Sequence, residues 1–194
     1  VLPKTDKQPE TKYTLKVIDS LNEQDKQKDL LNSIEIQSSL KHQAILQFIG
    51  FSLPNKNDEK YKLITEFAPN GSLSNMIKNY KSIDDWETVK AINIFGIAAG
   101  MAFIHQHDII LADLRPLSIF LDENNYPKIG GFVNAFCFKN GEICTNESPF
   151  KGIPIYMAPE LLREDHIPYS NKIDVYSYAM VLYSIFMKKN PSAG

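Results

Sequence analysis

The stretch from Ile109 to Ala135, IILADLRPLSIFLDENNYPKIGGFVNA, decides the fold of this chain. An apolar run leads into a single acidic residue, Asp113. Two short apolar segments, 118–122 and 126–132, then flank the polar turn Glu123-Asn124-Asn125, which is typical of two paired strands. The stretch therefore predicts a carboxylate in a loop, followed by a pair of strands.

The sequence before this stretch predicts strands with one helix. A β-rich run at 13–18 precedes a helical pattern at 28–40, and apolar runs at 44–53 and 61–67 predict a hairpin-like pair. The breaker cluster Ala68-Pro69-Asn70-Gly71 is the best candidate for a boundary. This half of the chain is therefore expected to form a small, strand-rich part.

The sequence after this boundary predicts mostly helices. A short helix at 72–80 opens with a serine cap, and a long helix at 87–106 is entered through Asp84-Asp85. The segment 131–154 is rich in Gly, Asn and Ser and predicts a long surface loop. The last helix, 172–188, is apolar nearly all round, which predicts burial in the middle of a domain.

Composition and charge exclude several classes of protein. With 43% apolar and 23% charged residues, the 194-residue chain is an ordinary globular sequence for one large domain or two small lobes. The net charge of −2 gives no reason to expect nucleic acid or an acidic membrane as a partner. The run 173–187 is interrupted by polar residues, so no segment is expected to span a membrane.

The cysteines and the first residues bear on the compartment. Cys137 and Cys144 have no metal-ligand spacing, and reduced thiols are favoured over a disulfide between them. The first residues do not form a signal peptide, and the missing initiator Met suggests a fragment. We therefore expect a cytoplasmic chain.

Several motifs occur in register along the chain. They are YTLK at 13–16, LKH at 40–42 with ILQFIG at 45–50, TEFAPNGSL at 65–73, LADLRPLS at 111–118, GFV at 131–133, GIPIYMAPE at 152–160 and DVYSYA at 174–179. Together they resemble the motifs of the eukaryotic protein kinase domain, and of the tyrosine-kinase-like (TKL) serine/threonine group in particular.

The resemblance implies an α+β fold of two lobes. Residues 1–67 would form a partial small lobe without the Gly-rich phosphate loop. Residues 68–194 would form the large lobe, truncated after its central helix. The resemblance thus covers nearly the whole chain.

The resemblance also implies that two magnesium ligands are missing. The metal-holding aspartate of kinases aligns with Gly131, and the metal-holding asparagine aligns with Ser118. Magnesium prefers anionic oxygen ligands in octahedral geometry, so we expect it to bind weakly or not at all. If each lost contact removes a few kcal/mol of transition-state stabilisation, the rate falls by roughly 10⁴-fold or more.

The residues that would bind the nucleotide are mostly present. The resemblance implies ATP, with Lys16 on its phosphates, Thr65 as gatekeeper, and Glu66 and Ala68 as hinge. Thr14 and Phe120 would lie above and below the adenine; both are larger than the usual residues, and a filled core without a pocket is the alternative. The usual glutamate partner of Lys16 aligns with Ser33, and Glu35 lies about 200° further round the helix.

Asp113 occupies the position of the catalytic base. Arg115-Pro116 after it is similar to the Lys-Pro of serine/threonine kinases. The alternative role for Asp113 is that of a loop aspartate that holds backbone amides. Without metal the two roles are equally supported.

Three hypotheses for the function follow. The first is a pseudokinase, a scaffold or allosteric module in signalling that binds other proteins. The second is a weakly active serine/threonine kinase that transfers the γ-phosphate of ATP with Asp113 as base. The third is an inert, truncated product.

Overall fold

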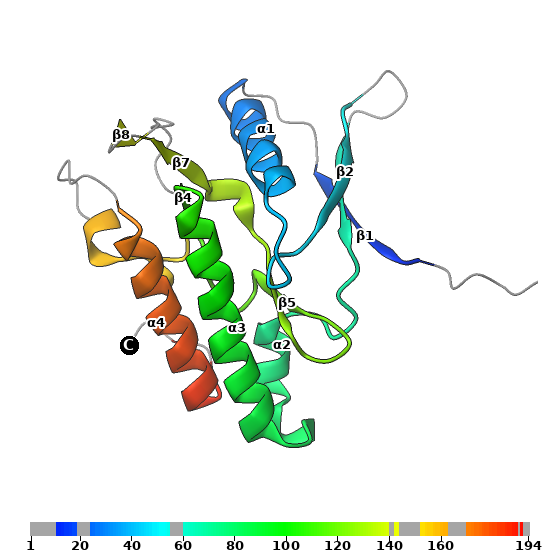
Figure 1. Cartoon of the computed structure of the whole chain (residues 1–194), viewed down its shortest axis with the longest axis vertical. Helices are drawn as coiled ribbons and strands as arrows, with labels where there is room; N and C mark the ends of the chain where they lie inside the picture. Colours follow the sequence, from blue (N-terminus) through cyan, green and yellow to red (C-terminus); the bar gives the residue numbers. More distant parts are fainter. Residues whose placement is uncertain are drawn as a thin grey trace, which may run out of the picture.

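The computed structural model describes residues 11–18, 24–54, 60–139, 142–143, 152–162, 170–189 and 191. A small part with a three-stranded sheet and one helix adjoins a larger part made mostly of helices (Figure 1). This arrangement confirms the predicted α+β class with a strand-rich and a helical part.

The small part is an antiparallel sheet of β1 (Tyr13–Ile18), β2 (Phe48–Ser52) and β3 (Tyr61–Glu66), in the order β1-β3-β2. The predicted hairpin is confirmed, but β2 begins four residues later than expected. The reason is tertiary: Ile45 forms a parallel bridge with Ile129 of the large part instead of extending the strand. The segment before β2 thus joins the two parts.

Helix α1 (Gln24–Ser39) has two apolar faces. Leu30 and Ile34, one turn apart, pack with Tyr61 of the sheet. Ile36 in its last turn and Leu40 just after its end are buried in the main core with residues of the large part. The helix begins four residues before the predicted start, and it fastens the small part to the large one.

The helices of the large part begin where their caps predict. The Ser72 side chain accepts a hydrogen bond from the backbone N–H of Asn75 at the start of α2 (Leu73–Lys78). Asp85 does the same for Thr88 at the start of α3 (Trp86–Gln106). A short 3-10 helix, η1 (Tyr80–Ser82), lies between them.

Strands β5 (Ile119–Leu121) and β6 (Pro127–Ile129) form the predicted antiparallel pair, and α3 packs closely against β6. A Cβ on Gly96 would lie 2.5 Å from Cγ of Pro127, and one on Gly100 would lie 2.7 Å from Cδ1 of Ile129. Both glycines are therefore required by the close approach of helix and strand.

Helix α3 corrects the expectation that no segment could span a membrane. By length and composition α3 is long and apolar enough to do so, because its few charges lie near one end. In the fold, Ile97, Met101 and Ile104 of this helix belong to the main core. A core helix of a folded domain has the same composition.

The segment 131–154, predicted as an irregular loop, contains regular structure. Gly131 and Phe132 do not extend β6; the 3-10 helix η2 (Phe132–Asn134) follows. Then β7 (Phe136–Lys139) pairs with β4 (Ile109–Ile110) and β8 (Glu142–Ile143). The prediction was wrong because the partner of β7 lies some 27 residues earlier in the chain, where local sequence gives no signal. Cys144 lies outside the described residues.

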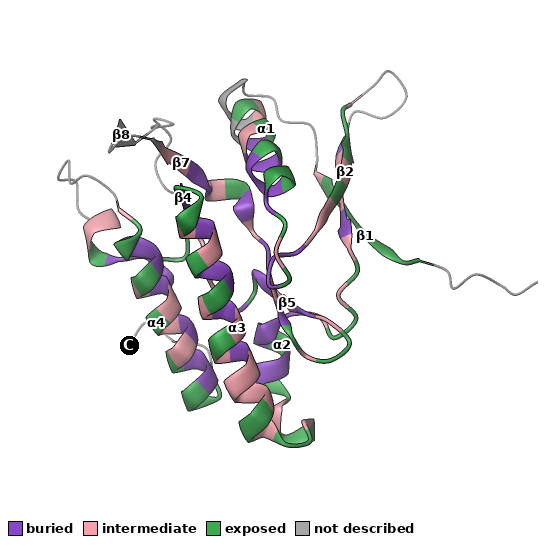
Figure 2. Ribbon diagram, in the orientation of Figure 1, coloured by how far each residue is buried: buried purple, intermediate pink, exposed green. Residues whose placement is uncertain are grey.

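Helix α4 (Lys172–Met187) is only partly buried, contrary to the prediction. Ile173, Val181 and Ile185 are buried, whereas Phe186 and Met187 are more than half exposed. Figure 2 accordingly shows both buried and exposed stretches along α4. Among the described elements, its main neighbours are α3 and the 3-10 helix η3 (Pro154–Tyr156), which cover only part of its surface. A further 3-10 helix, η4 (Pro159–Leu161), follows η3.

Candidate active site

The loop that contains Asp113 is held by hydrogen bonds to Asp174 of α4. The Asp174 carboxylate is 1% exposed; it accepts hydrogen bonds at 2.9 Å from the backbone N–H groups of Leu111 and Ala112. Nε2 of His105 also lies 2.9 Å from it. Ala112 has a left-handed φ of 60°, a strained conformation for a residue with a Cβ, and these bonds stabilise it.

Sequence reasoning assigned no role to Asp174. The available signal was an acidic residue inside an otherwise apolar helix, which is costly unless the carboxylate is hydrogen-bonded. The structure shows that this carboxylate satisfies buried backbone groups. Asp174, not a catalytic residue, therefore determines the path of the loop.

Asp113 is paired with Arg115. The Nε–H of Arg115 donates to the Asp113 carboxylate, with distances of 3.1 Å to Oδ2 and 3.0 Å to Oδ1. Burial raises the pKa of Asp113 above its ordinary value, and the charge and hydrogen bond of Arg115 partly offset this effect. The candidate base and the residue beside it thus form one unit.

Ser118 uses its hydroxyl to close the same loop. Its Oγ accepts a hydrogen bond from the backbone N–H of Arg115 at 3.2 Å. The same Oγ lies 2.9 Å from the carbonyl oxygen of Arg115 and 3.0 Å from that of Asp113, so its hydrogen is donated to the loop. The side chain is buried, and it acts as an internal tie.

Gly131 lies directly against Ser118. Its φ of 80° and ψ of 34° are left-handed, and a Cβ built on it would lie 2.8 Å from Cβ of Ser118. Real Cβ atoms essentially never approach another atom so closely. A side chain at position 131 would therefore require Ser118 to shift. Gly131 has no side-chain oxygen and Ser118 has only a neutral hydroxyl, so the two residues predicted at the metal-ligand positions do not supply the anionic oxygens that magnesium prefers.

The next residue, Phe132, anchors α1 to the site. Phe132 is buried in the main core together with Ile36 and Leu111. The side-chain amide of Asn32 in α1 donates to the carbonyl of Ala135 at 3.3 Å. The helix is therefore docked onto the turn that follows Gly131.

Lys16 has neither of its candidate partners. Ser33 is buried and its hydroxyl donates to the carbonyl of Leu30 at 2.7 Å, while Glu35 points to solvent. Lys16 is exposed and forms no ion pair with any residue that the structure describes. On α1, Ser33 therefore faces inward and Glu35 outward, as the angle of about 200° between them predicts.

The candidate nucleotide residues of the small part share one face of its sheet. Thr14 lies directly opposite Thr65, and Lys16 lies opposite Leu63, so these side chains point to the same side. Thr65 is buried and donates from its hydroxyl to the Glu66 carbonyl at 3.2 Å, whereas Thr14 is exposed.

The predicted hinge is joined to the large part. Oε1 of Glu66 accepts from the backbone N–H of Gln47 at 2.8 Å and lies 3.4 Å from Nζ of Lys128. The carbonyl of Ala68 accepts from the N–H of Gly71 at 3.2 Å. The hinge therefore has a fixed geometry, with its acidic side chain turned toward β6.

Phe120 lies on β5 opposite Lys128 and is half-buried. Its ring covers Gly130, where an added Cβ would lie 3.0 Å from Cε2. Two groups of predicted residues emerge: Asp113, Arg115, Ser118 and Gly131 form one contiguous cluster, and Thr14, Lys16 and Thr65 share a sheet face. In the described part of the chain, no hydrogen bond or ion pair connects the two groups.

Comparisons with known proteins agree with this architecture. A family model described as "Protein kinase domain" matches residues 1–194. The chain is 34% identical to a PR5-like receptor kinase of Arabidopsis thaliana, over 84% of this chain and 24% of that protein. It is 33% identical to the probable serine/threonine-protein kinase drkC of Dictyostelium discoideum, over 90% of this chain and 23% of that protein.

A third relative is the serine/threonine-protein kinase STY46 of Arabidopsis thaliana, which is 30% identical over 86% of this chain and 28% of that protein. The chain thus spans about a quarter of the length of the curated relatives that it matches.

Proposed function

The chain belongs to the protein kinase domain family, and from this premise we propose that it is a pseudokinase-type module, which binds other proteins in signalling instead of transferring phosphate. The observation that carries the proposal is the close contact between Gly131 and Ser118, because a metal-holding side chain at position 131 would require Ser118 to shift. We also propose that the module belongs to the TKL group and acts in the cytoplasm. Its partners would be proteins, with neither nucleic acid nor membrane among them.

The chemistry of phosphoryl transfer explains why this contact matters. Family members use ATP with a metal ion, which neutralises the charge that develops on the phosphates. In this chain, Ser118 Oγ is already engaged with the loop backbone, and Gly131 offers no donor atom. The protein therefore supplies positioning without the anionic ligands that hold the ion.

Nucleotide binding is a separate property from transfer. The adenine would lie between Thr14 and Phe120, beside Thr65 and the backbone of Glu66 and Ala68. The exposed Lys16 is the available cation for the phosphates. Any ATP held by these residues would be bound without a metal ion fixed by the protein, as a regulatory ligand of a scaffold.

A weakly active serine/threonine kinase is the second candidate, and Asp113 favours it. This carboxylate keeps the position of the base. Burial raises its pKa toward neutral pH, and a general base is more effective when its pKa lies near the working pH. Arg115 pairs with this carboxylate, and its positive charge would attract a phosphoryl group transferred beside Asp113. In this case metal would be held mainly by the phosphates of ATP.

Thermal unfolding of the purified chain with and without ATP, each with and without Mg²⁺, tests the proposal. A ligand present at 100 times its Kd stabilises the native state by about 2.7 kcal/mol, which raises the Tm of a domain of this size by roughly 5 to 10 °C. We expect no shift that depends on magnesium. A magnesium-dependent shift of that size would contradict the pseudokinase assignment.

Phosphate incorporation from labelled ATP separates the two candidates further. A weak kinase loses incorporation in both Lys16→Met and Asp113→Asn, while a binding module shows none in the unchanged chain. Lys12→Met, an exposed lysine just before β1, is the matched control. Incorporation that survives in Lys12→Met and disappears in Asp113→Asn would establish the kinase.

A further inference from the structure

Asn70 is followed by Gly71 in the segment that joins the small part to the large part. The chain contains two such Asn-Gly pairs, and the second, at 140–141, lies outside the described residues. In an Asn-Gly pair the side-chain amide is open to attack by the following backbone nitrogen, because glycine has no side chain to obstruct the approach. Asparagine is accordingly among the residues that are chemically least stable. The pair at 70–71 is therefore a candidate site of spontaneous modification.

The reaction of such a pair, deamidation, consumes only water. The backbone nitrogen of Gly71 would attack Cγ of Asn70 and form a C–N bond. The side-chain nitrogen then leaves as ammonia, which takes up the proton of the attacking N–H. Water opens the resulting succinimide ring at one of its two carbonyl carbons. The product is aspartate, or isoaspartate, in which the backbone runs through the former side-chain carbon.

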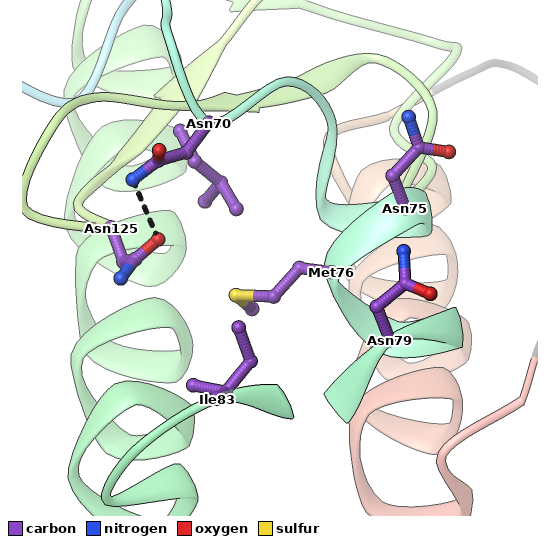
Figure 3. Close-up of a pocket in the computed structure, with 7 residues that line it drawn as sticks. Asn70, Asn75, Met76, Asn79, Ile83 and Asn125 are labelled. Carbon is purple, nitrogen blue, oxygen red and sulfur yellow. Dashed lines mark hydrogen bonds between the residues drawn. The ribbon is translucent and has the colours of Figure 1, made fainter. Parts of the chain in front are cut away.

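The side chain of Asn70 ties the hinge to the β5–β6 turn. Its Nδ2 group donates to the carbonyl of Asp122 at 2.8 Å and to Oδ1 of Asn125 at 2.9 Å (Figure 3). The carbonyl of Glu123 lies 3.4 Å from the same nitrogen. The fully buried Asn93 of α3 holds the turn from the other side by donating to the carbonyl of Asn125 at 3.1 Å. The tie thus depends on a donor that the loss of ammonia removes.

The backbone of the same pair is bonded to β5. The N–H of Asn70 donates to the carbonyl of Leu121 at 3.2 Å, and the N–H of Leu121 donates to the carbonyl of Gly71 at 2.9 Å. The next residue, Ser72, forms an antiparallel bridge with Phe120. Isoaspartate at position 70 adds one atom to this backbone, so the two hydrogen bonds to Leu121 cannot both stay in register.

In the folded chain, both reacting groups are engaged elsewhere. The N–H of Gly71 donates to the carbonyl of Ala68 at 3.2 Å, and the Asn70 amide is bonded to the β5–β6 turn. Cyclisation requires both groups to leave these hydrogen bonds, so the hinge must first open locally. Asn70 is exposed, and with Asn75, Asn79 and Asn125 it lines a cavity of about 270 Å³, so water reaches it. The fold therefore slows the reaction without preventing it.

The product would no longer hold the turn. A carboxylate has only acceptors, and at position 70 it would face the carbonyls of Asp122 and Glu123, which are acceptors as well. Asn125 can rotate its amide and donate, whereas the two backbone carbonyls cannot. The side chains of Asp122 and Glu123 already give this turn two negative charges. The contact would therefore change from attractive to repulsive.

We propose that Asn70 is a deamidation site and that its conversion releases the hinge from the β5–β6 turn. Because local opening must come first, the reaction records how often the hinge opens and then keeps it from closing fully. The result is a slow, one-way change in the joint between the two parts of the molecule. The proposal does not depend on whether phosphate transfer survives.

The test is incubation of the purified chain near neutral pH, followed by digestion and mass spectrometry of its peptides, with chromatography to separate isoaspartate from aspartate. We expect conversion at Asn70 in the folded chain, and conversion about 10- to 30-fold faster in urea, because two hydrogen-bonded groups are then free. In urea, Asn140 should react at a similar rate, since only the local Asn-Gly pair then matters.

Two variants of Asn125 test whether the tie controls the rate. Asn125→Ala removes the Oδ1 acceptor and should speed conversion at Asn70 by about 3- to 10-fold. Asn125→Asp keeps an acceptor and tolerates the left-handed φ of 62°, so conversion should be as slow as in the unchanged chain, or slower. Asn124→Ala, which changes an exposed residue of the same turn, is the control and should leave the rate unchanged.

The consequence of conversion is tested by Asn70→Asp, which creates one of the two products directly. We expect its Tm to fall by roughly 3 to 6 °C, because a buried-side donor is replaced by an acceptor that faces carbonyls. Asn124→Asp adds the same charge to the same turn without touching the tie, so its Tm should change little.

Three results would overturn the proposal. They are no conversion of Asn70 in the folded chain by the time the unfolded chain is fully converted, equal rates in the folded and unfolded chain, or equal Tm values for Asn70→Asp and Asn124→Asp. A failure here leaves the pseudokinase proposal unaffected, because that proposal rests on Gly131 and Ser118.

Discussion

The loop that contains Asp113 and the sheet of the small part hold their candidate functional residues in different ways. In the loop, Asp113 is paired with Arg115, and Ser118 and Asp174 hydrogen-bond to the backbone. On the sheet, Thr14 and Lys16 point to solvent, and Lys16 forms no ion pair with any described residue. The polar groups of the loop therefore bond to one another, whereas Thr14 and Lys16 on the sheet face are exposed to solvent.

This difference bears on our proposal that the kinase frame persists without its metal ligands. The loop is held by Asp174 and Ser118, neither of which needs a metal or a nucleotide for its bonds. We therefore expect the stability of the fold and any catalysis to depend on different residues. Substitutions in the two regions should therefore differ in their effect on the free energy of unfolding, from large in the loop to almost none on the sheet.

Asp174→Asn should have the largest effect. The buried N–H groups of Leu111 and Ala112 and the ring of His105 would lose a charged acceptor, at a cost of about 3 to 5 kcal/mol. Urea unfolding followed through Trp86, the single tryptophan, measures the loss. The exposed Asp84→Asn is the control, and equal stability of both variants would refute the role given to Asp174.

Gly131→Ala and Gly131→Asp should come next, each with a loss of about 1 to 3 kcal/mol. The cause is the left-handed backbone together with the close approach of Ser118. Gly50→Ala is the matched control, because nothing lies within 4 Å of its added Cβ. If Gly131→Asp folds without cost and gains stabilisation from Mg²⁺ with ATP, the site is less closed than the geometry indicates.

Ser118→Ala should cost about 1 to 2 kcal/mol, because the N–H of Arg115 and a loop carbonyl lose their common partner. Ser52→Ala, an exposed serine on β2, should change the free energy of unfolding little. The two urea midpoints, measured side by side, give the comparison. A neutral Ser118→Ala would mean that the loop is held by Asp174 alone.

Lys16→Met should be the smallest change, within about 0.5 kcal/mol, since surface positions without partners contribute little to stability. Lys12→Met should behave in the same way. A clear destabilisation by Lys16→Met alone would indicate a partner for the ammonium group and would weaken the contrast between loop and sheet.

Much of the fold could be predicted from local sequence. The ranges of β1 and the β5–β6 pair follow from alternation and turn residues, and Ser72 and Asp85 mark the starts of two helices. Sequence also placed Ser33 inward and Glu35 outward on α1, because a helix fixes the angle between them. Each of these signals acts over a few residues.

The errors share a different cause. Strand β7 was missed because its partner β4 is remote in sequence, and the exposure of α4 depends on which elements pack against it. The role of Asp174 could not be predicted either, since the backbone N–H groups that donate to its carboxylate lie more than 60 residues away. In each case the deciding contact is long-range.

The sequence by itself determined that this chain has a kinase-like frame, and it predicts that Gly131 and Ser118 stand where metal ligands would be. Only the tertiary structure decided that these two residues are in close contact, and that four asparagines from separate segments line one cavity. The physical reason is that side-chain chemistry is written in the chain, whereas the distance between two side chains is set by the packing of the elements that carry them.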